Sequence, residues 1–369
     1  TFTRPVAEMR MGILTFTERW QKLLGIDEVF YITENYLQEK FRKPEPQQSL
    51  FIVPNFFPSD EVLKQIRDLQ PGEALVYDNE VLVANINMDQ FSLNQISKMT
   101  DITEKLLFIE KPTDIFSHND FAINFDFALV TKGKTSQELS SSNGFIGEKE
   151  NLFIEEGASV EFSTLNCKTG KIYIGKNAEI MEGSNIRGSL ALCEDSKINL
   201  GTKLYGGTTI GPHCKVGGEV NNMVIFGYSN KGHDGFLGNS VIGEWCNLGA
   251  DTNSSNLKNN YASVKLWNYR KKRFLDTGLQ FCGLIMGDHS KTAINTQLNT
   301  GTTVGVASNI FKSGFPPNLV DSFSWGGMKG DEKFRLDKSY EVAEKAMGRR
   351  KIPLTDFDKD ILKYIYNEF

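Results

Sequence analysis

The chain contains a long aliphatic repeat with a period of six residues, and this repeat limits its fold more than any other feature. Large aliphatic residues occupy eight consecutive positions at this spacing: Ile174, Ile180, Ile186, Leu192, Ile198, Leu204, Ile210 and Val216. The repeat resumes in a second phase at Phe236, Ile242 and Leu248, and in a third at Met286, Leu298, Val304 and Ile310. We interpret each change of phase as an insertion. Glycine often follows the aliphatic position, as in Ile174-Gly175 and Ile210-Gly211, which suits tight corners with unusual backbone angles.

A period of six excludes ordinary helices and strands for this part of the chain. A helix cannot bury one residue in six on a coherent stripe, and a half-buried strand buries every second residue. Short strands that close triangular coils would point every sixth side chain inward, onto the neighbouring coils. The repeat therefore predicts an all-β left-handed parallel β-helix of the hexapeptide-repeat class over residues 141–330, an exception to right-handed crossover connections. A generic β-rich domain with accidental spacing is the alternative.

The texture of the sequence changes near residue 140 and again near residue 331. Residues 1–140 alternate aliphatic runs, at 28–32 and 50–53, with a helical pattern at 59–69 that has Ser59 as its expected N-cap. We expect an α/β domain here, joined to the β-helix by the Ser-, Thr-, Asn- and Gly-rich segment 135–144. Residues 331–369 fit two C-terminal helices separated by Pro353. Because Thr1 stands in place of a methionine, we expect the first strand of the N-terminal domain to precede it.

Composition and charge exclude several classes of protein. The net charge is −5, from 41 Lys and Arg against 46 Asp and Glu, which gives no electrostatic reason to attract nucleic acid or an anionic membrane. No run reaches the roughly 18 apolar residues that would span a bilayer. The five cysteines are scattered, without a CxxC pair, and fit reduced thiols better than disulfides or a zinc site. We expect a soluble, cytoplasmic protein with no nucleic-acid or membrane partner.

The residues that could carry chemistry lie where the repeat changes phase. His233 is one of four histidines and occupies the irregular stretch 229–238, near Lys231 and Asp234. An imidazole beside a lysine and a carboxylate can act as a general base near pH 7. A structural loop histidine is the alternative. A zinc site made by His213, His233 and His289 is disfavoured because their spacing lacks a close pair, and we assign no metal ligand.

Residues 231–252 resemble a known acetyltransferase site. The segment contains Lys231, His233, Phe236-Leu237-Gly238, Ile242-Gly243 and Asn247-Leu248-Gly249-Ala250. This pattern is similar to the acetyltransferase site of the bacterial bifunctional N-acetylglucosamine-1-phosphate uridylyltransferase/glucosamine-1-phosphate N-acetyltransferase family. The chain looks like a divergent branch of that family with a shorter N-terminal domain. The resemblance covers most of residues 140–330 and, in the N-terminal part, residues 2–14. It implies a nucleotidyltransferase-like α/β domain followed by an acyltransferase β-helix.

The resemblance implies roles for three polar residues. His233 corresponds to the general base that takes a proton from the sugar amine. Asn247 and Asn256 correspond to asparagines that position the sugar phosphate and the acyl donor. The implied reaction is direct acyl transfer, in which the amine attacks the thioester of acetyl-CoA while backbone amides stabilise the oxyanion. Cys246 suggests a covalent route, but without an activating base it is better explained as a buried structural thiol.

The phosphate-binding positions of the family are substituted in this chain. Phe236 stands where the family has a phosphate-binding tyrosine, so that hydroxyl is missing. Tyr205 stands in the place of an arginine that grips phosphate. Arg187 or Lys231 could compensate, although either could equally be a surface cation. In the family the clefts lie between neighbouring prisms, so the resemblance also implies a homotrimer acting on a small sugar phosphate.

The insertion at residues 253–278 is longer than the corresponding loop of the family. Its middle, residues 264–274, alternates apolar and polar residues around a basic turn and predicts a β-hairpin. We expect the hairpin to wall the acyl-donor cleft, with Lys271, Lys272 and Arg273 near the phosphates of coenzyme A. A hairpin that mainly makes subunit contacts is the alternative.

A uridylyltransferase would also need a glycine-rich phosphate loop with a basic residue and a carboxylate for Mg²⁺. No Gly-x-Gly occurs before residue 140. Arg4, Arg10 and Gly12 are the candidate nucleotide-binding residues, as the end of a divergent loop. UTP and Mg²⁺ are expected only if this domain is active. Asn55 resembles the end of a nucleotide-binding strand, with a structural turn as the alternative.

Three functions stay open. The first is acetyl transfer from acetyl-CoA to glucosamine-1-phosphate, coupled to uridylyl transfer from UTP to give UDP-N-acetylglucosamine for cell-wall synthesis. The second is a sugar-1-phosphate nucleotidyltransferase whose β-helix is only an oligomerisation scaffold. The third is a non-catalytic trimer that binds a sugar phosphate or is purely structural. The stretches around His233 and Asn247 favour the first, because a scaffold needs only the aliphatic period.

Overall fold

In a computed structural model of the chain we describe residues 2–45, 47–88 and 92–369. The chain forms two compact units. The smaller unit comprises residues 4–9 and 15–110, and the larger comprises residues 10–14, 111–369 and the first residues of the chain. The division between units thus falls at residue 110, whereas the texture of the sequence changes near residue 140.

The smaller unit is built on a four-stranded sheet in the order β3-β6-β5-β7. β3 (Gln48–Ile52) and β5 (Glu73–Tyr77) pair antiparallel with β6 (Glu80–Asn87), and β7 (Lys98–Asp101) pairs parallel with β5. The other elements are η1 (Val6–Glu8), α1 (Phe16–Leu24), α2 (Asn35–Gln38), β4 (Phe56–Phe57), α3 (Asp60–Asp68), η3 (Leu93–Gln95) and β8 (Leu107–Phe108). This mixture confirms the expected α/β character of the N-terminal part.

Local sequence signals explain two of these elements and fail at a third segment. The Ser59 hydroxyl accepts a hydrogen bond from the backbone N–H of Val62, at 3.2 Å, so the expected N-cap of α3 is confirmed. The aliphatic run 50–53 overlaps β3, which ends at Ile52. The run 28–32 forms no strand. Its Tyr31 instead pairs locally, with its N–H donating to the carbonyl of Arg42 at 2.9 Å and its ring beside Phe41.

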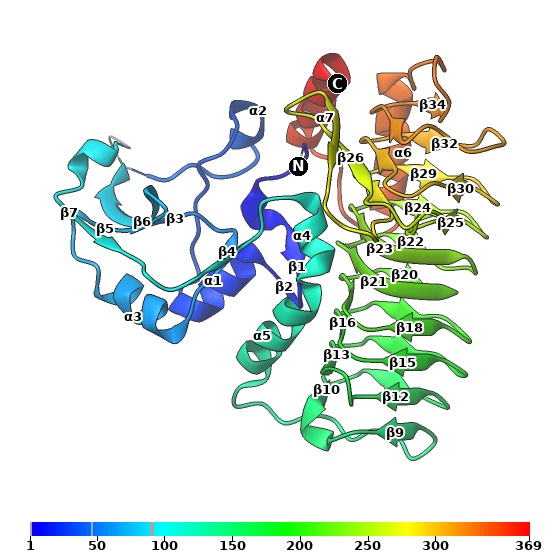
Figure 1. Cartoon of the computed structure of the whole chain (residues 1–369), viewed down its shortest axis with the longest axis horizontal. Coiled ribbons are helices and arrows are strands. Elements are labelled where there is room, and N and C mark those ends of the chain that lie inside the picture. Colours follow the sequence, from blue (N-terminus) through cyan, green and yellow to red (C-terminus); the bar gives the residue numbers. More distant parts are fainter. Residues whose placement is uncertain (1, 46, 89–91) are drawn as a thin grey trace. The chain divides into compact units, whose positions relative to one another are not determined.

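The larger unit contains the expected left-handed β-helix, whose short strands stack into the faces of a triangular prism (Figure 1). Strands of successive coils pair in parallel, as in the register Ile172 with Leu190 and Leu190 with Thr208. One face is a nine-stranded sheet: β11 (Ser159–Val160), β14 (Glu179–Ile180), β17 (Lys197–Ile198), β20 (Lys215–Val216), β22 (Asn230–Lys231), β24 (Asn247–Leu248), β29 (Lys291–Thr292), β32 (Asn309–Ile310) and β34 (Trp325–Gly326).

The other two faces share a 13-stranded sheet and a two-stranded sheet. The 13 strands are β9 (Gly144–Ile146), β10 (Leu152–Ile154), β12 (Thr164–Asn166), β13 (Ile172–Ile174), β15 (Asn185–Arg187), β16 (Leu190–Leu192), β18 (Lys203–Tyr205), β19 (Thr208–Ile210), β21 (Glu219–Ile225), β23 (Phe236–Ile242), β28 (Ile285–Met286), β31 (Thr303–Val304) and β33 (Leu319–Val320). The remaining pair is β25 (Asn253–Ser254) with β30 (Gln297–Leu298). A single turn of 3-10 helix, η4 (Lys149–Asn151), precedes β10.

The interior of the prism confirms the first phase of the repeat and corrects the second. All eight aliphatic side chains from Ile174 to Val216 are at most 2% exposed and belong to one core. In the second phase Ile242 and Leu248 are buried in the same core, but Phe236 is only half-buried. The inward residue is its neighbour Leu237, because β23 pairs with β21 in the register Val220 with Leu237.

The first change of phase is a shortening of the coil, so its interpretation as an insertion is wrong. Buried core positions follow one another at 216, 220 and 225, closer than the usual six residues. β21 consequently runs around a corner as one strand and pairs with both β18 and β19. The change between Leu248 and Met286 is a true insertion and contains the hairpin.

The glycines that follow the aliphatic positions serve close packing, so our explanation from unusual backbone angles is wrong. Gly175 and Gly211 are absent from the positions with positive φ. A Cβ atom at Gly211 would lie 1.6 Å from the carbonyl oxygen of Phe226 in the next coil. Positive φ occurs instead two residues later, at His213. Glycine is therefore required where one corner rests directly on the next.

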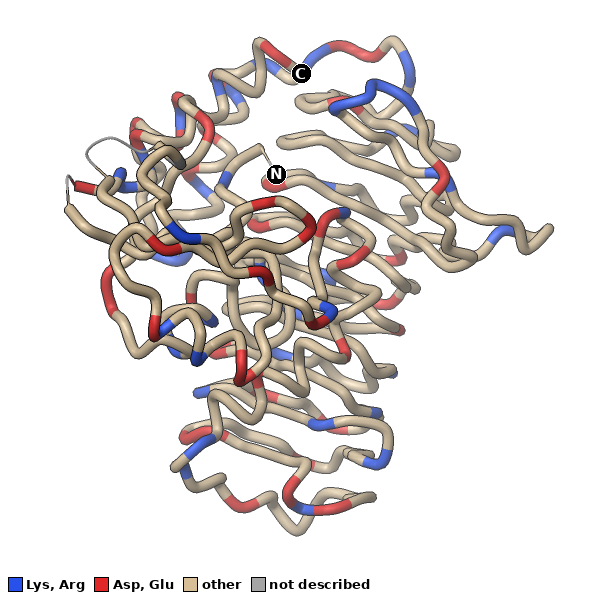
Figure 2. Tube along the Cα trace, turned by 60° about the vertical axis from the view of Figure 1, so that its left-hand side comes forward, with Lys and Arg blue, Asp and Glu red and all other residues tan. Residues whose placement is uncertain are grey.

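Helices cover parts of the β-helix within the larger unit. They are α4 (Pro112–Ser117), α5 (Asn119–Thr131) and the C-terminal α6 (Leu336–Gly348) and α7 (Asp356–Glu368), and the last two confirm the expected C-terminal helices. α5 packs through Ile123 and Phe127 against Ala191 of the prism. Each helix among the described residues is too short or too polar to span a bilayer. Figure 2 shows acidic and basic residues interspersed along the coils.

Candidate active site

The candidate base lies on a corner of the prism between β22 and β23. β22 ends at Lys231, and the chain turns through residues 232–235 before β23 begins at Phe236. The side chain of His233 is exposed on this turn. Among the described residues it makes no side-chain hydrogen bond or ring contact, so its imidazole is available to a ligand.

Three hydrogen bonds from neighbouring coils hold the backbone of this corner. The side-chain amide of Asn199 donates to the carbonyl of Gly232 at 2.7 Å. The backbone N–H of Asp251 donates to the carbonyl of Asp234 at 3.0 Å. The N–H of Phe236 donates to the side-chain oxygen of Asn253 at 2.8 Å. An exposed imidazole on a fixed backbone can come within hydrogen-bond reach of a substrate proton, as a general base must.

Two of the predicted substrate-binding residues lie together just beyond this corner. The Asn256 amide donates to the side-chain oxygen of Asn239 at 2.8 Å. A Cβ atom at Gly238 would meet Asn256 Nδ2 at 2.5 Å and Phe236 Cζ at 2.7 Å, so Phe236 and Asn256 flank this glycine. The half-buried Phe236 ring offers an apolar surface, and no hydroxyl, beside the asparagine amide.

The other predicted substrate-binding residues lie farther away within the single chain. Asn247 is exposed on the nine-stranded face, where β24 pairs with β22 at Asn230. Tyr205 is 44% exposed and pairs with Asn221, which in turn pairs with Gly238. It therefore lies two strand spacings, about 10 Å, from the Phe236 and Asn256 pair. Arg187 is exposed on β15, the strand next to β18.

Lys231 points into the prism and presents no charge to a phosphate on the surface. Its side chain is 2% exposed and stacks in the core on Val216, its partner in the coil before. Its ammonium donates to the carbonyls of Gly217 and His233, both at 2.8 Å. Burial lowers the pKa of Lys231 to about 8, partly offset by the carboxylates of Asp234 and Asp251.

Cys246 is a buried thiol, as expected. Its Sγ donates to the carbonyl of Gly287 at 3.2 Å, and burial raises its pKa to about 12. A thiol with such a pKa carries almost no nucleophilic thiolate near neutral pH. This favours direct transfer over a covalent acyl-enzyme.

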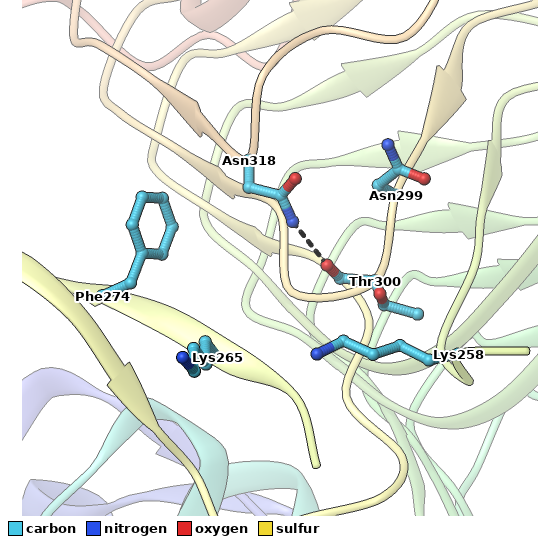
Figure 3. A pocket seen from close by; sticks show the side chains of 6 residues that line it. All are labelled: Lys258, Lys265, Phe274, Asn299, Thr300 and Asn318. Atoms are coloured by element: carbon cyan, nitrogen blue, oxygen red, sulfur yellow. Dashed lines mark hydrogen bonds between the residues drawn. The ribbon is translucent and has the colours of Figure 1, made fainter. Parts of the chain in front are cut away.

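The insertion forms the predicted hairpin, and the hairpin walls a pocket. β26 (Lys265–Asn268) and β27 (Arg273–Asp276) pair antiparallel. Beside them lies a pocket of about 370 Å³, which Figure 3 shows between the hairpin and the later coils. It is lined by Lys258, Lys265, Phe274, Asn299, Thr300 and Asn318.

The pocket contains cations that sequence reasoning missed. The ammonium of Lys258 donates to the carbonyl of Ser263 at 2.7 Å and lies near Thr300 in Figure 3. Asn318 donates to the carbonyl of Thr300 at 2.6 Å. The predicted cations Lys271, Lys272 and Arg273 are exposed at the tip of the hairpin and do not line this pocket. The alternation of polar and apolar residues along the hairpin could have identified Lys265 as a surface cation, since this alternation exposes Lys265 and buries Leu266.

The predicted nucleotide-binding residues are divided between the two units. Arg4 is half-buried in the smaller unit. Arg10 is 9% exposed in the larger unit, and its guanidinium donates to the carbonyl of Ile13. Gly12 turns there with φ +74°, and a Cβ atom would lie 2.5 Å from Asp126 Oδ2. Asn55 donates its side-chain amide to the carbonyl of Ile109 at 2.9 Å, which is a structural contact.

The segment 10–14 is bound to α5 and the prism by buried hydrogen bonds. The N–H of Gly12 donates to the side-chain oxygen of Asn119 at 2.8 Å, and the Thr209 hydroxyl donates to the carbonyl of Gly12, also at 2.8 Å. The N–H of Ile13 donates to a carboxylate oxygen of Asp126 at 2.9 Å. These contacts give Gly12 a packing role in this unit.

Comparisons with known proteins support the resemblance read from the sequence. Residues 1–135 match the family described as sugar nucleotidyl transferase. The Bifunctional protein GlmU of Methanocaldococcus jannaschii is 36% identical over 87 residues, covering 24% of this chain and 21% of that protein. The bifunctional sugar-1-phosphate nucleotidylyltransferase/acetyltransferase of Sulfurisphaera tokodaii is 34% identical over 93 residues, covering 25% and 23%. The matches span about a fifth of each relative's length, and they confirm the expected resemblance.

Solved structures give weaker likenesses. A hexapeptide transferase family protein from Anaplasma phagocytophilum aligns at 12% identity over 62% of this chain and 93% of that chain, with a TM-score of 0.15. A mutant of AntD, an N-acyltransferase from Bacillus cereus in complex with dTDP and coenzyme A, aligns at 15% identity over 56% and 91%, with a TM-score of 0.19.

Proposed function

We propose that the β-helix transfers the acetyl group of acetyl-CoA to the amine of glucosamine-1-phosphate. The proposed second step, in the N-terminal unit, is uridylyl transfer from UTP to give UDP-N-acetylglucosamine. The observation that carries the proposal is the exposed imidazole of His233 on a corner whose backbone is fixed, from which the chain continues into β23, where Phe236 and Asn256 flank Gly238. The two bifunctional relatives and the family match over residues 1–135 support it.

In the proposed transfer, His233 takes a proton from the sugar amine as its nitrogen attacks the thioester carbonyl. The new bond is the amide C–N bond, and the bond that breaks is the C–S bond of the thioester. The leaving thiolate takes up a proton and departs as free coenzyme A. The inert thiol of Cys246 supports this direct route.

Magnesium is implied only for the uridylyl step. In residues 2–45, 47–88 and 92–369 no group of three or more His, Cys, Asp or Glu residues is placed to hold a metal ion. Mg²⁺ in such enzymes is bound by few carboxylates together with substrate phosphates.

A nucleotidyltransferase whose β-helix is only a scaffold is the second candidate. The family match supports it, since it covers the N-terminal part and not the β-helix. The substituted phosphate-binding positions, Phe236 and Tyr205, also favour it. Acyl transfer that depends on His233 would distinguish the first candidate from this one.

We place the acyl donor in the pocket beside the hairpin, where Lys258 and Lys265 supply positive charge and Phe274 an apolar wall. Lys265→Ala is then expected to raise KM for acetyl-CoA about tenfold, which corresponds to about 1.4 kcal/mol of lost binding, with kcat within twofold. Steady-state kinetics with acetyl-CoA varied would measure this. Lys271→Ala, at the hairpin tip, is the matched control. If Lys271→Ala raised KM and Lys265→Ala did not, the phosphates would lie at the tip instead.

We propose a homotrimer that packs along the corner carrying His233. Three apolar side chains lie two residues after a strand of the nine-stranded face, as His233 does: Phe162 is 68% exposed, Leu200 67% and Ile294 69%. Large apolar side chains that are mostly exposed along one ridge mark a contact surface. Neighbouring copies on this ridge would close a cleft over His233.

Charging the ridge is expected to dissociate the trimer. The double variant Leu200→Lys/Ile294→Lys should elute as a monomer, because each lysine would have to be buried in the contact. Light scattering after gel filtration would measure the mass. Phe357→Lys is the matched control, since Phe357 is 47% exposed on α7, away from the ridge. A double variant with the same mass as a wild-type trimer would contradict this placement, and so would a monomeric wild type.

A further inference from the structure

We propose that Lys231 is a positioning residue that holds the corner carrying His233 from inside the prism. The inference rests on the proposed acyl transfer and adds a residue that acts through the backbone of the base. The evidence is that the Lys231 ammonium is buried in the core and donates hydrogen bonds to two backbone carbonyls.

Lys231 occupies a core position that the fold otherwise fills with aliphatic side chains. β22 pairs with β20 in the register Lys231 with Val216, and the neighbouring strand β24 presents the buried Leu248. A methionine or leucine at position 231 would continue this column. Placing a charged group there costs free energy unless it is fully compensated.

The compensation comes from the backbone of two corners. The ammonium donates at 2.8 Å to the carbonyl of Gly217 and at 2.8 Å to the carbonyl of His233. Gly217 belongs to the shortened coil, and His233 to the coil that follows. Lys231 therefore ties the corner with the proposed base to the corner stacked on it.

The two corners are in direct backbone contact, so a hydrogen bond from the core can fix one against the other. A Cβ atom at Gly217 would lie 2.7 Å from the carbonyl oxygen of Gly232, and one at Gly218 would lie 2.8 Å from Asp234 Cα. The two corners thus touch backbone to backbone. Asn199 fixes the carbonyl of Gly232 from the coil before, at 2.7 Å. Lys231 bonds the carbonyl of His233 itself, whereas Asn199, Asp251 and Asn253 bond its neighbours, so Lys231 acts most directly on the backbone that carries the imidazole.

Lys231→Met tests this role, because it keeps the length of the side chain and removes the ammonium. We expect kcat for acyl transfer to fall about 10- to 100-fold, as for a displaced catalytic group, with KM for both substrates within twofold. Leu248→Met is the matched control, since it changes core packing in the adjacent coil without touching the corner. It should retain the wild-type kcat.

A double-mutant cycle with Asn199→Ala separates positioning from general stability. Both single variants should lower kcat, and the double variant should lose less than the product of the two, because both act on one corner. Independent effects on kcat, or a lower melting temperature with unchanged kcat in Lys231→Met, would overturn the inference.

Hydrogen–deuterium exchange of the segment 229–240 measures directly, without an activity assay, whether Lys231 holds this corner. Lys231→Met should raise deuterium uptake there, and Leu248→Met should not. A wild type without transferase activity would overturn the proposed function, and the exchange result would then decide alone whether Lys231 holds the corner. Unchanged uptake in Lys231→Met would reject that role.

Discussion

His233→Ala is expected to lower kcat for acyl transfer about 10²- to 10⁴-fold, the usual contribution of a general base. The protein should stay folded, because the His233 side chain is exposed and the corner is held by the Lys231 ammonium and the Asn199 amide. KM for acetyl-CoA should stay within about twofold, since the proposed donor pocket is lined by other residues. Initial rates of thiol release, with circular dichroism as the check on folding, would measure both.

Lys176→Ala is the matched control for His233→Ala. It also removes an exposed side chain from a corner of the β-helix, between β13 and β14, but it leaves His233 and its neighbours unchanged. We expect its activity to stay within about twofold of the wild type, since it removes no interaction with the reacting groups. If the wild type were active and His233→Ala equally so, another group would have to accept the proton.

Gly211→Ala is expected to destabilise the protein by on the order of 4 kcal/mol or more, which places it among the most damaging single substitutions. Its Cβ atom would lie 1.6 Å from the carbonyl oxygen and 2.3 Å from the carbonyl carbon of Phe226. Backbone on both sides of this contact cannot move without separating two coils. We expect a fall in Tm of roughly 10 °C or more, or loss of soluble protein.

Gly201→Ala is the matched control in the same β-helix. Gly201 has φ +66°, and nothing lies within 4 Å of an added Cβ atom. Only the left-handed backbone opposes this substitution, at a cost of about 1–2 kcal/mol. Differential scanning fluorimetry of both variants would compare them. A Gly211→Ala protein with the same melting temperature as Gly201→Ala would contradict the close stacking of these coils.

The aliphatic period predicted the β-helix because burial in a prism leaves a direct trace in the sequence. Each aliphatic repeat position from Ile174 to Val216 points into the same core, so the six-residue spacing in the sequence matches the spacing of buried positions in the structure. The pattern fails where the coil is shortened. There Leu237 takes the inward place predicted for Phe236, since the sequence offers an apolar residue at both positions.

Contacts between distant segments could not be predicted from the sequence. The burial of Gly12 depends on Asn119 and Thr209, which lie far away along the chain. The proposed donor pocket likewise combines Lys258 and Lys265 of the insertion with Asn318 of a later coil. The sequence also did not predict that Lys231 points into the core. Lysine is rarely found in a core, and position 231 becomes an inward position only because the coil before it is shortened.

Thiol release by the wild-type protein with acetyl-CoA and glucosamine-1-phosphate is the decisive test of acyl transfer by the β-helix. We expect release of one equivalent of coenzyme A per acetylated amine, identified by mass spectrometry of the sugar phosphate. No thiol should be released when the amine is already acetylated. A folded wild type that releases no thiol with glucosamine-1-phosphate or other amino-sugar phosphates would exclude acyl transfer and favour the scaffold.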